Sequence, residues 1–190
     1  MLGDMKKMKI LFVDSPPTLD WTPSSRFTKG GRRWPSLTVT GEKTYCYLNL
    51  SAAAVARERG HQVYYIDCQA EGVALPELLD KVKNIDPDLA VFYVEQIKVN
   101  VDFAIIKQLK RWQKAKVVFV GPFVTPLDRE VLTLSPFLDF VIRGEYDYAV
   151  ADLAETMGNG GKIEDIPGIT WRDGEEISQG KPANRLTDLN

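Results

Sequence analysis

The stretch Lys116-Val-Val-Phe-Val-Gly-Pro-Phe-Val-Thr-Pro126 decides the fold of this 190-residue chain. Its first half is an unbroken run of β-branched and aromatic residues, which is typical of a strand covered by helices on both faces. Gly121 and Pro122 end this strand, because glycine tolerates any backbone angle and proline has no N–H to donate. Thr125 and Pro126 then suit an N-cap and a first helical residue. This order of strand, glycine loop and helix start predicts a loop at the carboxyl edge of a parallel sheet, where open α/β folds bind ligands.

More runs of this kind lie along the chain. The sequence predicts strands at residues 8–14, 62–67, 89–94, 116–120 and 137–142. It predicts helices at residues 45–60, 74–84, 100–114, 126–134 and 146–157, the third of them capped by Asn100 or Asp102. Strands that alternate with helices favour right-handed crossovers and a parallel sheet. We therefore predict an α/β fold, a flavodoxin-like (Rossmann-like) three-layer sandwich with a five-stranded parallel sheet in the order 2-1-3-4-5.

Two segments do not follow this alternation. The connection from Ser15 to about residue 43 is long, and a connection of this length inside a small domain is usually functional. Beyond residue 162, Asp173 and Gly174 separate two extended runs, which predicts a small C-terminal β-hairpin. The polar tail after it is typical of a linker. We divide the chain into an α/β domain, residues 1–161, and a hairpin with a linker, residues 162–190.

Composition excludes several classes of protein. A net charge of −2 argues against a nucleic-acid partner, which usually requires a basic surface. No apolar run approaches the length of about eighteen residues that a membrane span needs, and the start of the chain does not read as a signal peptide, so we expect a cytoplasmic protein without a membrane partner. Two cysteines, Cys46 and Cys68, and one histidine are too few for an iron–sulfur cluster or a structural zinc. We predict no metal site made by this chain.

The sequence offers no catalytic arrangement either. His61 lies in the short turn that enters the second predicted strand, at the amino edge of the sheet, and we expect it to be exposed to solvent. It therefore lies opposite the predicted ligand edge and cannot serve a Ser/His/Asp or Cys/His site there. A receiver domain is disfavoured because the third strand ends in Tyr93-Val-Glu-Gln96 instead of a phosphorylatable aspartate. Ser15-Pro-Pro17 also offers few backbone donors for the phosphate of a flavin nucleotide.

The long connection contains a segment in which cations and aromatic residues are interleaved, residues 25–34. Two interpretations of it stay open: a solvated loop, or a site for an anionic substrate or a partner. In the second, carboxylates or phosphates would be bound by cationic side chains with Trp34 beside them. The residues concerned are Arg26, Lys29, Arg32, Arg33 and Trp34.

Five pieces of sequence, in this order, carry a resemblance to a known family. They are Met8-Lys-Ile-Leu-Phe-Val-Asp-Ser-Pro-Pro17, Leu48-Asn-Leu-Ser-Ala-Ala-Ala-Val-Ala-Arg-Glu-Arg-Gly-His-Gln-Val-Tyr-Tyr-Ile-Asp67, Val118-Phe-Val-Gly-Pro-Phe-Val-Thr125, Asp139-Phe-Val-Ile-Arg-Gly-Glu145 and Ile166-Pro-Gly-Ile-Thr-Trp-Arg172. Together they resemble the N-terminal cobalamin (B12)-binding domain of B12-dependent radical SAM proteins. The resemblance spans nearly the whole chain.

The resemblance implies a cobalamin cofactor for this domain. S-adenosylmethionine and a [4Fe–4S] cluster would belong to a radical SAM domain of the same polypeptide, because this chain has no CxxxCxxC motif. The reaction implied is methyl transfer to an unactivated carbon of a small-molecule substrate. Ring formation of the kind carried out by anaerobic magnesium-protoporphyrin monomethyl ester cyclase is the other possibility. This chain alone would then not be catalytic, since the cofactors carry the chemistry.

The resemblance also assigns a cofactor site to the strand ends. Its residues are Ser15, Pro16, Val94, Glu95, Gln96, Gly121, Pro122, Phe123, Val124, Thr125, Gly144 and Glu145. Gly121 and Gly144 would leave room for the flat corrin, or would simply end their strands. Gln96 or Thr125 would hydrogen-bond the corrin amides, and Glu145 would contact the ligand or complement a helix dipole.

Two departures from the family pattern leave alternatives open. The loop after the fourth predicted strand reads Gly121-Pro122-Phe123, where relatives usually have two glycines and a histidine. An Asp-x-His-x-x-Gly motif, which ligates cobalt in methionine-synthase-type domains, is absent after the first strand. Either cobalamin binds without a protein histidine ligand, or the domain has lost it. The alternative function is a cofactor-free interaction or substrate-recruiting domain that uses the loop of residues 25–34.

Overall fold

The computed structural model of the chain describes residues 6–23, 27–30, 34–37 and 46–183. Its strands are β1 (Lys9–Asp14), β2 (Phe27–Gly30), β3 (Trp34–Leu37), β4 (Gln62–Asp67), β5 (Leu89–Tyr93), β6 (Lys116–Val120), β7 (Phe140–Ile142), β8 (Ile169–Asp173) and β9 (Glu176–Gln179). Its helices are α1 (Tyr47–Glu58), α2 (Cys68–Glu71), α3 (Leu75–Ile85), α4 (Val99–Leu109), α5 (Asp128–Leu134) and α6 (Asp147–Asn159), with 3₁₀ turns at Thr125–Leu127 and Ile163–Asp165.

The main sheet has the order β4-β1-β5-β6-β7-β8-β9, and its first five strands are parallel. These five strands confirm the predicted order 2-1-3-4-5. The chain leaves β1 toward β4 on one side and then returns to β5 on the other. The topological switch point therefore lies between β1 and β5, and open α/β sheets bind ligands outside the carboxyl ends of such strands.

The predicted C-terminal hairpin is present, and it extends the same sheet to seven strands. β8 pairs antiparallel with β7, with Ile169 opposite Ile142, and β9 pairs antiparallel with β8. The turn between β8 and β9 contains Gly174 at φ 61°. Because β8 runs against β7, the turn lies at the amino edge of the sheet, and the open end of the hairpin lies at the carboxyl edge.

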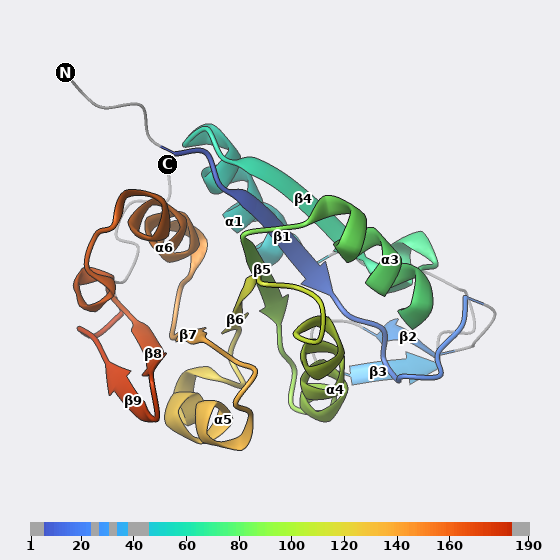
Figure 1. The fold of residues 1–190 in the computed structure, drawn as a ribbon. Helices are drawn as coiled ribbons and strands as arrows, with labels where there is room; N and C mark the ends of the chain where they lie inside the picture. The colour runs from blue at the N-terminus through green and yellow to red at the C-terminus, as the bar shows by residue number, and fades with distance from the viewer. Residues whose placement is uncertain (1–5, 24–26, 31–33, 38–45, 184–190) are drawn as a thin grey trace.

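Helices cover both faces of the sheet. Ile10 and Phe12 of β1 pack with α1 and α6, whereas Leu11 and Val13 pack with α3, α4 and α5. Figure 1 shows α3 and α4 on the viewer's side of the sheet and α1 behind β1. A strand that is buried on both faces needs apolar residues at every position, which explains the continuous apolar runs of the sequence.

Some connections contain elements that the sequence pattern did not predict. β2 and β3 pair as a separate two-stranded antiparallel sheet inside the long connection after β1, which we predicted without strands. They lie beyond the carboxyl end of β1 (Figure 1). Lys29, Gly30 and Pro35 interrupt any alternation of apolar and polar residues there, so the pattern gave no strand signal. Residues 68–71 form the one-turn helix α2, because the Asp67 carboxylate accepts the N–H groups of Gln69 and Ala70 at 3.1 and 3.0 Å.

His61 lies at the amino edge as predicted, but the prediction of an exposed turn residue is wrong. Its exposed fraction is 6%, and its Nδ1 accepts the backbone N–H of Met8 at 3.3 Å. The segment that enters β1 covers the turn that enters β4, so two adjacent strand starts enclose the ring. Burial lowers the pKa of His61, with Glu155 acting against this shift and Arg59 adding to it.

No helix among the described residues combines the length and the apolar composition that crossing a bilayer would require.

Candidate functional site at the carboxyl edge

The structure brings the predicted cofactor-site residues to one edge of the sheet. They lie in the loops that follow β1, β5, β6 and β7, and the carboxyl ends of parallel strands share an edge. Their exposure to solvent differs. Gln96, Pro122, Gly144 and Glu145 are exposed, and Glu95, Phe123 and Thr125 are half-buried. Ser15, Pro16, Val94, Gly121 and Val124 are buried, so they support this rim from below.

Gly121 is required by the close approach of the β5 and β6 ends. Its φ is 115°, and a Cβ placed on it would lie 3.1 Å from the carbonyl oxygen of Val94 and 3.2 Å from the ring of Tyr93. No L-residue with a side chain adopts this conformation without strain. Gly121 therefore keeps the centre of the edge free of side-chain bulk.

Thr125 ties the loops after β6 and β7 together. Its Oγ1 donates to the carbonyl oxygen of Gly121 at 3.0 Å and accepts the N–H of Gly144 at 3.0 Å. The predicted role of Thr125 as an N-cap is wrong: the 3₁₀ turn Thr125–Leu127 precedes α5, and the hydroxyl makes no cap bond. Its hydrogen bonds instead fix the position of Gly144 at the rim relative to Gly121 beneath it.

A buried polar cluster lies beneath the switch point between β1 and β5. The Ser15 hydroxyl donates to Oδ1 of Asp102, and Nζ of Lys98 donates to Oγ of Ser15 at 3.2 Å. Lys98 is 1% exposed, and Asp102 and Ser15 are fully buried. Glu95 Oε2 lies 3.9 Å from Lys98 Nζ. We call Ser15, Lys98 and Asp102 the switch-point cluster, and it fixes the loop after β1 to the start of α4.

Sequence reasoning missed the role of Lys98 and assigned Asp102 to a different one. α4 begins at Val99, one residue before the predicted start, so Asn100 and Asp102 both lie inside the helix and neither caps it. A lysine just before a helix is usually solvated, and only the tertiary fold shows that this one is enclosed.

A second polar network lies at the same carboxyl edge, on the face of the sheet that α1 and α6 cover. Tyr65 Oη donates to Asp14 Oδ2 at 2.6 Å, and Asn49 Nδ2 approaches the same oxygen at 3.4 Å. Tyr146 Oη donates to Asn49 Oδ1 at 3.1 Å. Burial raises the pKa of both tyrosines, and the nearby Asp14 carboxylate raises that of Tyr65 further, so both phenols stay protonated as donors. The network joins β1, β4, α1 and α6.

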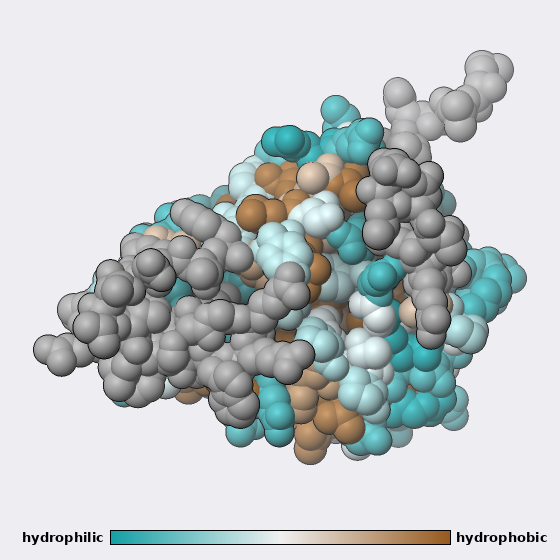
Figure 2. All heavy atoms as spheres, turned by 180° about the vertical axis from the view of Figure 1, so that it is seen from behind, coloured by the Kyte–Doolittle hydropathy of each residue, from teal (hydrophilic) through white to brown (hydrophobic). Residues whose placement is uncertain are grey.

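Exposed apolar side chains flank this edge on the α1 and α6 face. Tyr47 and Leu50 in the first turn of α1 are 49% and 42% exposed, and Tyr148 in the first turn of α6 is 49% exposed. From behind, where α1 lies in front of the sheet, hydrophobic side chains are exposed in patches between hydrophilic ones (Figure 2).

The cationic segment of residues 25–34 falls largely outside the described part of the chain. Arg26, Arg32 and Arg33 lie outside the described residues, and for Lys29 and Trp34 the structure describes only the backbone, in β2 and β3. A ligand or partner role for this segment therefore stays a prediction.

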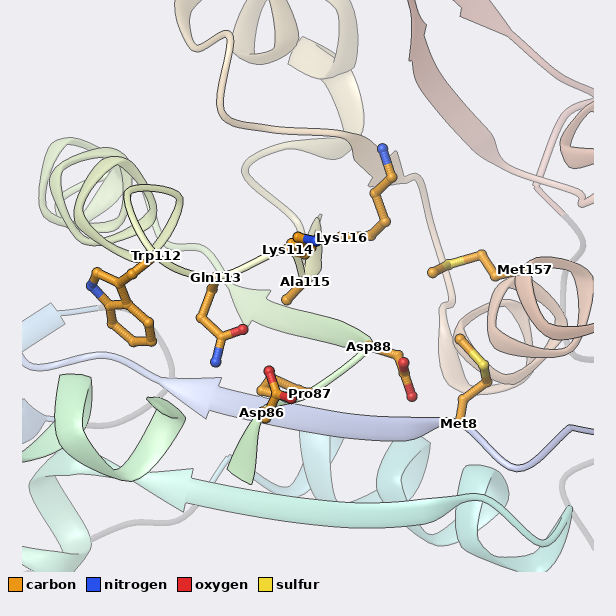
Figure 3. A pocket seen from close by; sticks show the side chains of 10 residues that line it. All are labelled: Met8, Asp86, Pro87, Asp88, Trp112, Gln113, Lys114, Ala115, Lys116 and Met157. Carbon is orange, nitrogen blue, oxygen red and sulfur yellow. The ribbon is translucent and has the colours of Figure 1, made fainter. Parts of the chain in front are cut away.

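A pocket of about 530 Å³ lies at the opposite, amino edge of the sheet (Figure 3). It is lined by Met8, Asp86, Pro87, Asp88, Trp112, Gln113, Lys114, Ala115, Lys116 and Met157. Two of its charged groups already serve the fold: Asp88 accepts the N–H of Lys9 at 2.8 Å, and Lys116 pairs with Asp139 at 2.8 Å. Within the described residues, no group of three or more His, Cys, Asp or Glu side chains could hold a metal ion.

The curated relatives of this chain include a methyltransferase and a cyclase. It is 26% identical over 179 residues to an uncharacterized methyltransferase of Pyrococcus horikoshii, covering 94% of this chain and 36% of that protein. It is 34% identical over 73 residues to the anaerobic magnesium-protoporphyrin IX monomethyl ester cyclase of Synechocystis, covering 38% of this chain and 15% of the cyclase.

Solved structures share the fold at low sequence identity. The cobalamin-dependent S-adenosylmethionine radical enzyme OxsB, with aqua-cobalamin and S-adenosylmethionine bound, matches with a TM-score of 0.72 and 14% identity, over 96% of this chain and 23% of OxsB. The radical S-adenosylmethionine methyltransferase TsrM of Kitasatospora setae, with cobalamin and a [4Fe–4S] cluster bound, matches with a TM-score of 0.66 and 15% identity, over 97% of this chain and 30% of TsrM. The chain thus spans about a third or less of the length of these proteins.

The B12-binding domain model matches residues 48–154, from the first turn of α1 into α6. This match includes the loops after β4, β5, β6 and β7 and covers more than half of the sequence. The chain therefore belongs to the B12-binding domain family, whose cofactor is cobalamin.

Proposed function

We propose that this chain holds cobalamin at the carboxyl edge of its sheet, as the cobalamin-binding module of a B12-dependent radical SAM protein. The observation that carries this proposal is that the family match, residues 48–154, falls on the elements that build this edge. An open parallel sheet offers a ligand the crevice at its switch point, between β1 and β5.

The residues at the edge suit a flat macrocycle. Gly121 and Gly144 carry no side chain, and a Cβ on either would meet neighbouring chain at 3.1 or 3.0 Å, so the loops after β6 and β7 stay thin. Gln96 is exposed at the rim, and its amide can both donate to and accept from the corrin amides. Phe123 supplies an apolar contact beside it. Ser15, Pro16, Val94 and Val124 would support the rim from within, and Pro122, Thr125, Glu95 and Glu145 would complete it.

Cobalt would be held without a histidine of this chain. The sequence contains one histidine, His61, and it is buried at the start of β4. The six residues of β4 span about 20 Å from that edge to the other. When bound, cobalamin supplies the methyl-transfer or ring-forming chemistry. The role of this chain is to bind the corrin and to orient it.

The partner in this proposal is a radical SAM domain of the same polypeptide, which would hold S-adenosylmethionine and a [4Fe–4S] cluster. Residues 1–161 would form the cofactor domain, and residues 162–190 the hairpin and the linker toward that partner. The exposed Tyr47, Leu50 and Tyr148 beside the edge suit contact with such a domain. OxsB and TsrM are single enzymes of which a comparable fold is one part.

A spectroscopic experiment tests the proposal. The purified chain is mixed with hydroxocobalamin, desalted, and its visible spectrum recorded. We expect corrin absorbance to remain with the protein, near one cobalamin per chain, and to be lost when the same mixture is desalted in urea. No retained absorbance at high micromolar concentrations of both partners would contradict the proposal.

A further inference from the structure

The chain returns to the carboxyl edge after β9. Thr170 pairs with Gln179 and Ile142 with Ile169, so the end of β9 lies beside the start of β8, at the carboxyl end of β7. The next residues, 180–183, continue along this edge, and we call them the exit segment. Gly180 donates its N–H to Ile169 at 2.9 Å, and Lys181 accepts the N–H of Gly168 at 2.9 Å.

Arg143 clamps the exit segment to the end of β7. Its Nε donates to the carbonyl oxygen of Gly168 at 3.2 Å, and one terminal nitrogen donates to those of Lys181 and Gly180 at 3.1 and 3.3 Å. Asp128 lies 3.3 Å from Nε and balances the charge. The planar guanidinium can bind several carbonyls at fixed angles, which a lysine ammonium cannot do as well.

The exit segment lies directly against the rim of the candidate site. A Cβ placed on Gly144 would lie 3.0 Å from the Cβ of Ala183, so the glycine brings the two backbones into close approach. Gly144 also donates its N–H to Thr125, whose hydroxyl donates to Gly121. Hydrogen bonds therefore connect the exit segment, through Arg143 and Gly144, to the loop after β6.

From this arrangement we propose that the exit segment forms the β7-side wall of the cobalamin site, and that Arg143 is the positioning residue that holds this wall. The inference rests on the proposed function and deepens it. The family match ends at residue 154, so the wall lies outside the matched region. If the wall contacts the ligand, ligand binding and the order of the exit segment are linked reciprocally. Bound ligand should slow amide hydrogen exchange in the segment, and loosening the segment should weaken ligand binding.

Arg172 provides a matched control. It also holds the hairpin, but at the amino edge, where its guanidinium donates to the carbonyl oxygens of Leu132, Ser135 and Leu138. Both arginines are half-buried and bind backbone carbonyls, and only Arg143 contacts the exit segment. Comparing Arg143→Met with Arg172→Met therefore separates the wall from the general stability of the hairpin.

The experiment measures hydroxocobalamin affinity and amide hydrogen exchange of the 190-residue chain and its variants. In the unsubstituted chain we expect bound cobalamin to slow exchange in peptides that cover residues 180–183. Arg143→Met should weaken affinity on the order of tenfold and abolish this protection, whereas Arg172→Met should change affinity by about twofold at most. Arg143→Lys keeps a cation beside Asp128, and hence the fold, and should give an intermediate loss.

Two outcomes would overturn the inference while leaving the proposed function standing: cobalamin binding without protection of residues 180–183, or equal losses of affinity in Arg143→Met and Arg172→Met. If the unsubstituted chain does not bind cobalamin at all, the proposed function fails and the inference fails with it.

Discussion

Single residues at the two edges of the sheet have opposite roles. At the carboxyl edge, Gly121 and Gly144 keep the loops thin, and the hydroxyl of Thr125 joins them. At the amino edge, His61 and Asp88 fill the spaces between strand starts and bind backbone N–H groups. The first group leaves room for a ligand, and the second closes the fold.

Replacing Gly121 with alanine should lower the free energy of unfolding by about 2 kcal/mol, since the left-handed conformation and the contact with Val94 both oppose a Cβ. Gly160→Ala is the control, because Gly160 has φ 71° and nothing within 4 Å of its Cβ position. It should cost about 1 kcal/mol, the conformational part alone. Urea unfolding of the two variants measures the difference, and equal costs would show that the contact at Gly121 is unimportant.

The free energy of unfolding should decrease as the pH is lowered below about 6.5, the ordinary pKa of histidine. Burial lowers the pKa of folded His61, so the unfolded chain binds a proton more readily than the folded one. The stabilisation is thus complete above the unfolded pKa and decreases as pH falls toward the folded pKa. Urea unfolding at pH 7.5 and 5.5 tests this.

His61→Asn is the matching variant for this pH effect. Asparagine can still accept the N–H of Met8 but does not titrate, so it should remove part of the loss between the two pH values. A variant with the same loss as the unsubstituted chain would assign the pH dependence to other groups.

Replacing Lys98 with methionine should destabilise the chain by about 3 kcal/mol, because Glu95 would lose the buried cation beside it. The same cation bonds the Ser15 hydroxyl that donates to Asp102, so the switch-point cluster would lose its positive charge. Lys116→Met is the control: Lys116 is half exposed, and Asp139 keeps its bond to Lys110, so the change should stay within about 0.5 kcal/mol. Adding Asp102→Leu to Lys98→Met should recover part of the loss, as paired removal of buried charges often does. Urea unfolding of all three variants measures these differences.

At the scale of elements, the strands and helices that the sequence predicted each have a clear hydrophobic pattern and a residue that marks their end. The parallel strands are continuous apolar runs such as residues 117–120, and Asp173-Gly174 marked the hairpin. The elements that it did not predict lack such signals. β2 and β3 carry Gly30 and Pro35, and α2 is a single turn that begins at the carboxyl group of Asp67. The switch-point cluster was missed because Lys98 and Asp102 resemble surface residues until the fold encloses them.

The dependence of α2 on one carboxylate can be tested. Asp67→Ala removes the acceptor for the N–H groups of Gln69 and Ala70 and should cost about 1 kcal/mol, with faster amide exchange in residues 69–71. Asp67→Asn keeps an acceptor oxygen and should retain most of the stability. If amide exchange in residues 69–71 is equally fast in both variants, the negative charge of Asp67 stabilises α2 more than its acceptor oxygen does.

At the scale of the whole molecule, the sheet separates the proposed ligand edge from an edge that holds the fold together. The rim glycines, the switch-point cluster and the exit segment all lie toward the carboxyl edge. The amino-edge pocket, His61 and the turn of the hairpin lie at the other. Substitutions at the amino edge should therefore change stability without changing ligand affinity.

Ligand binding should raise the stability of the whole molecule, since the core spans the sheet and unfolds with the site. Hydroxocobalamin at about 100 times its Kd should add about 2.7 kcal/mol to the free energy of unfolding. For a chain of this size that is a rise in Tm of about 5 to 10 °C. His61→Asn should start from a different Tm but show the same rise, because His61 lies about 20 Å from the rim, at the opposite end of β4. Thermal unfolding followed by circular dichroism, with and without the corrin, measures both, and a rise that disappears in His61→Asn would place the ligand at the amino edge instead.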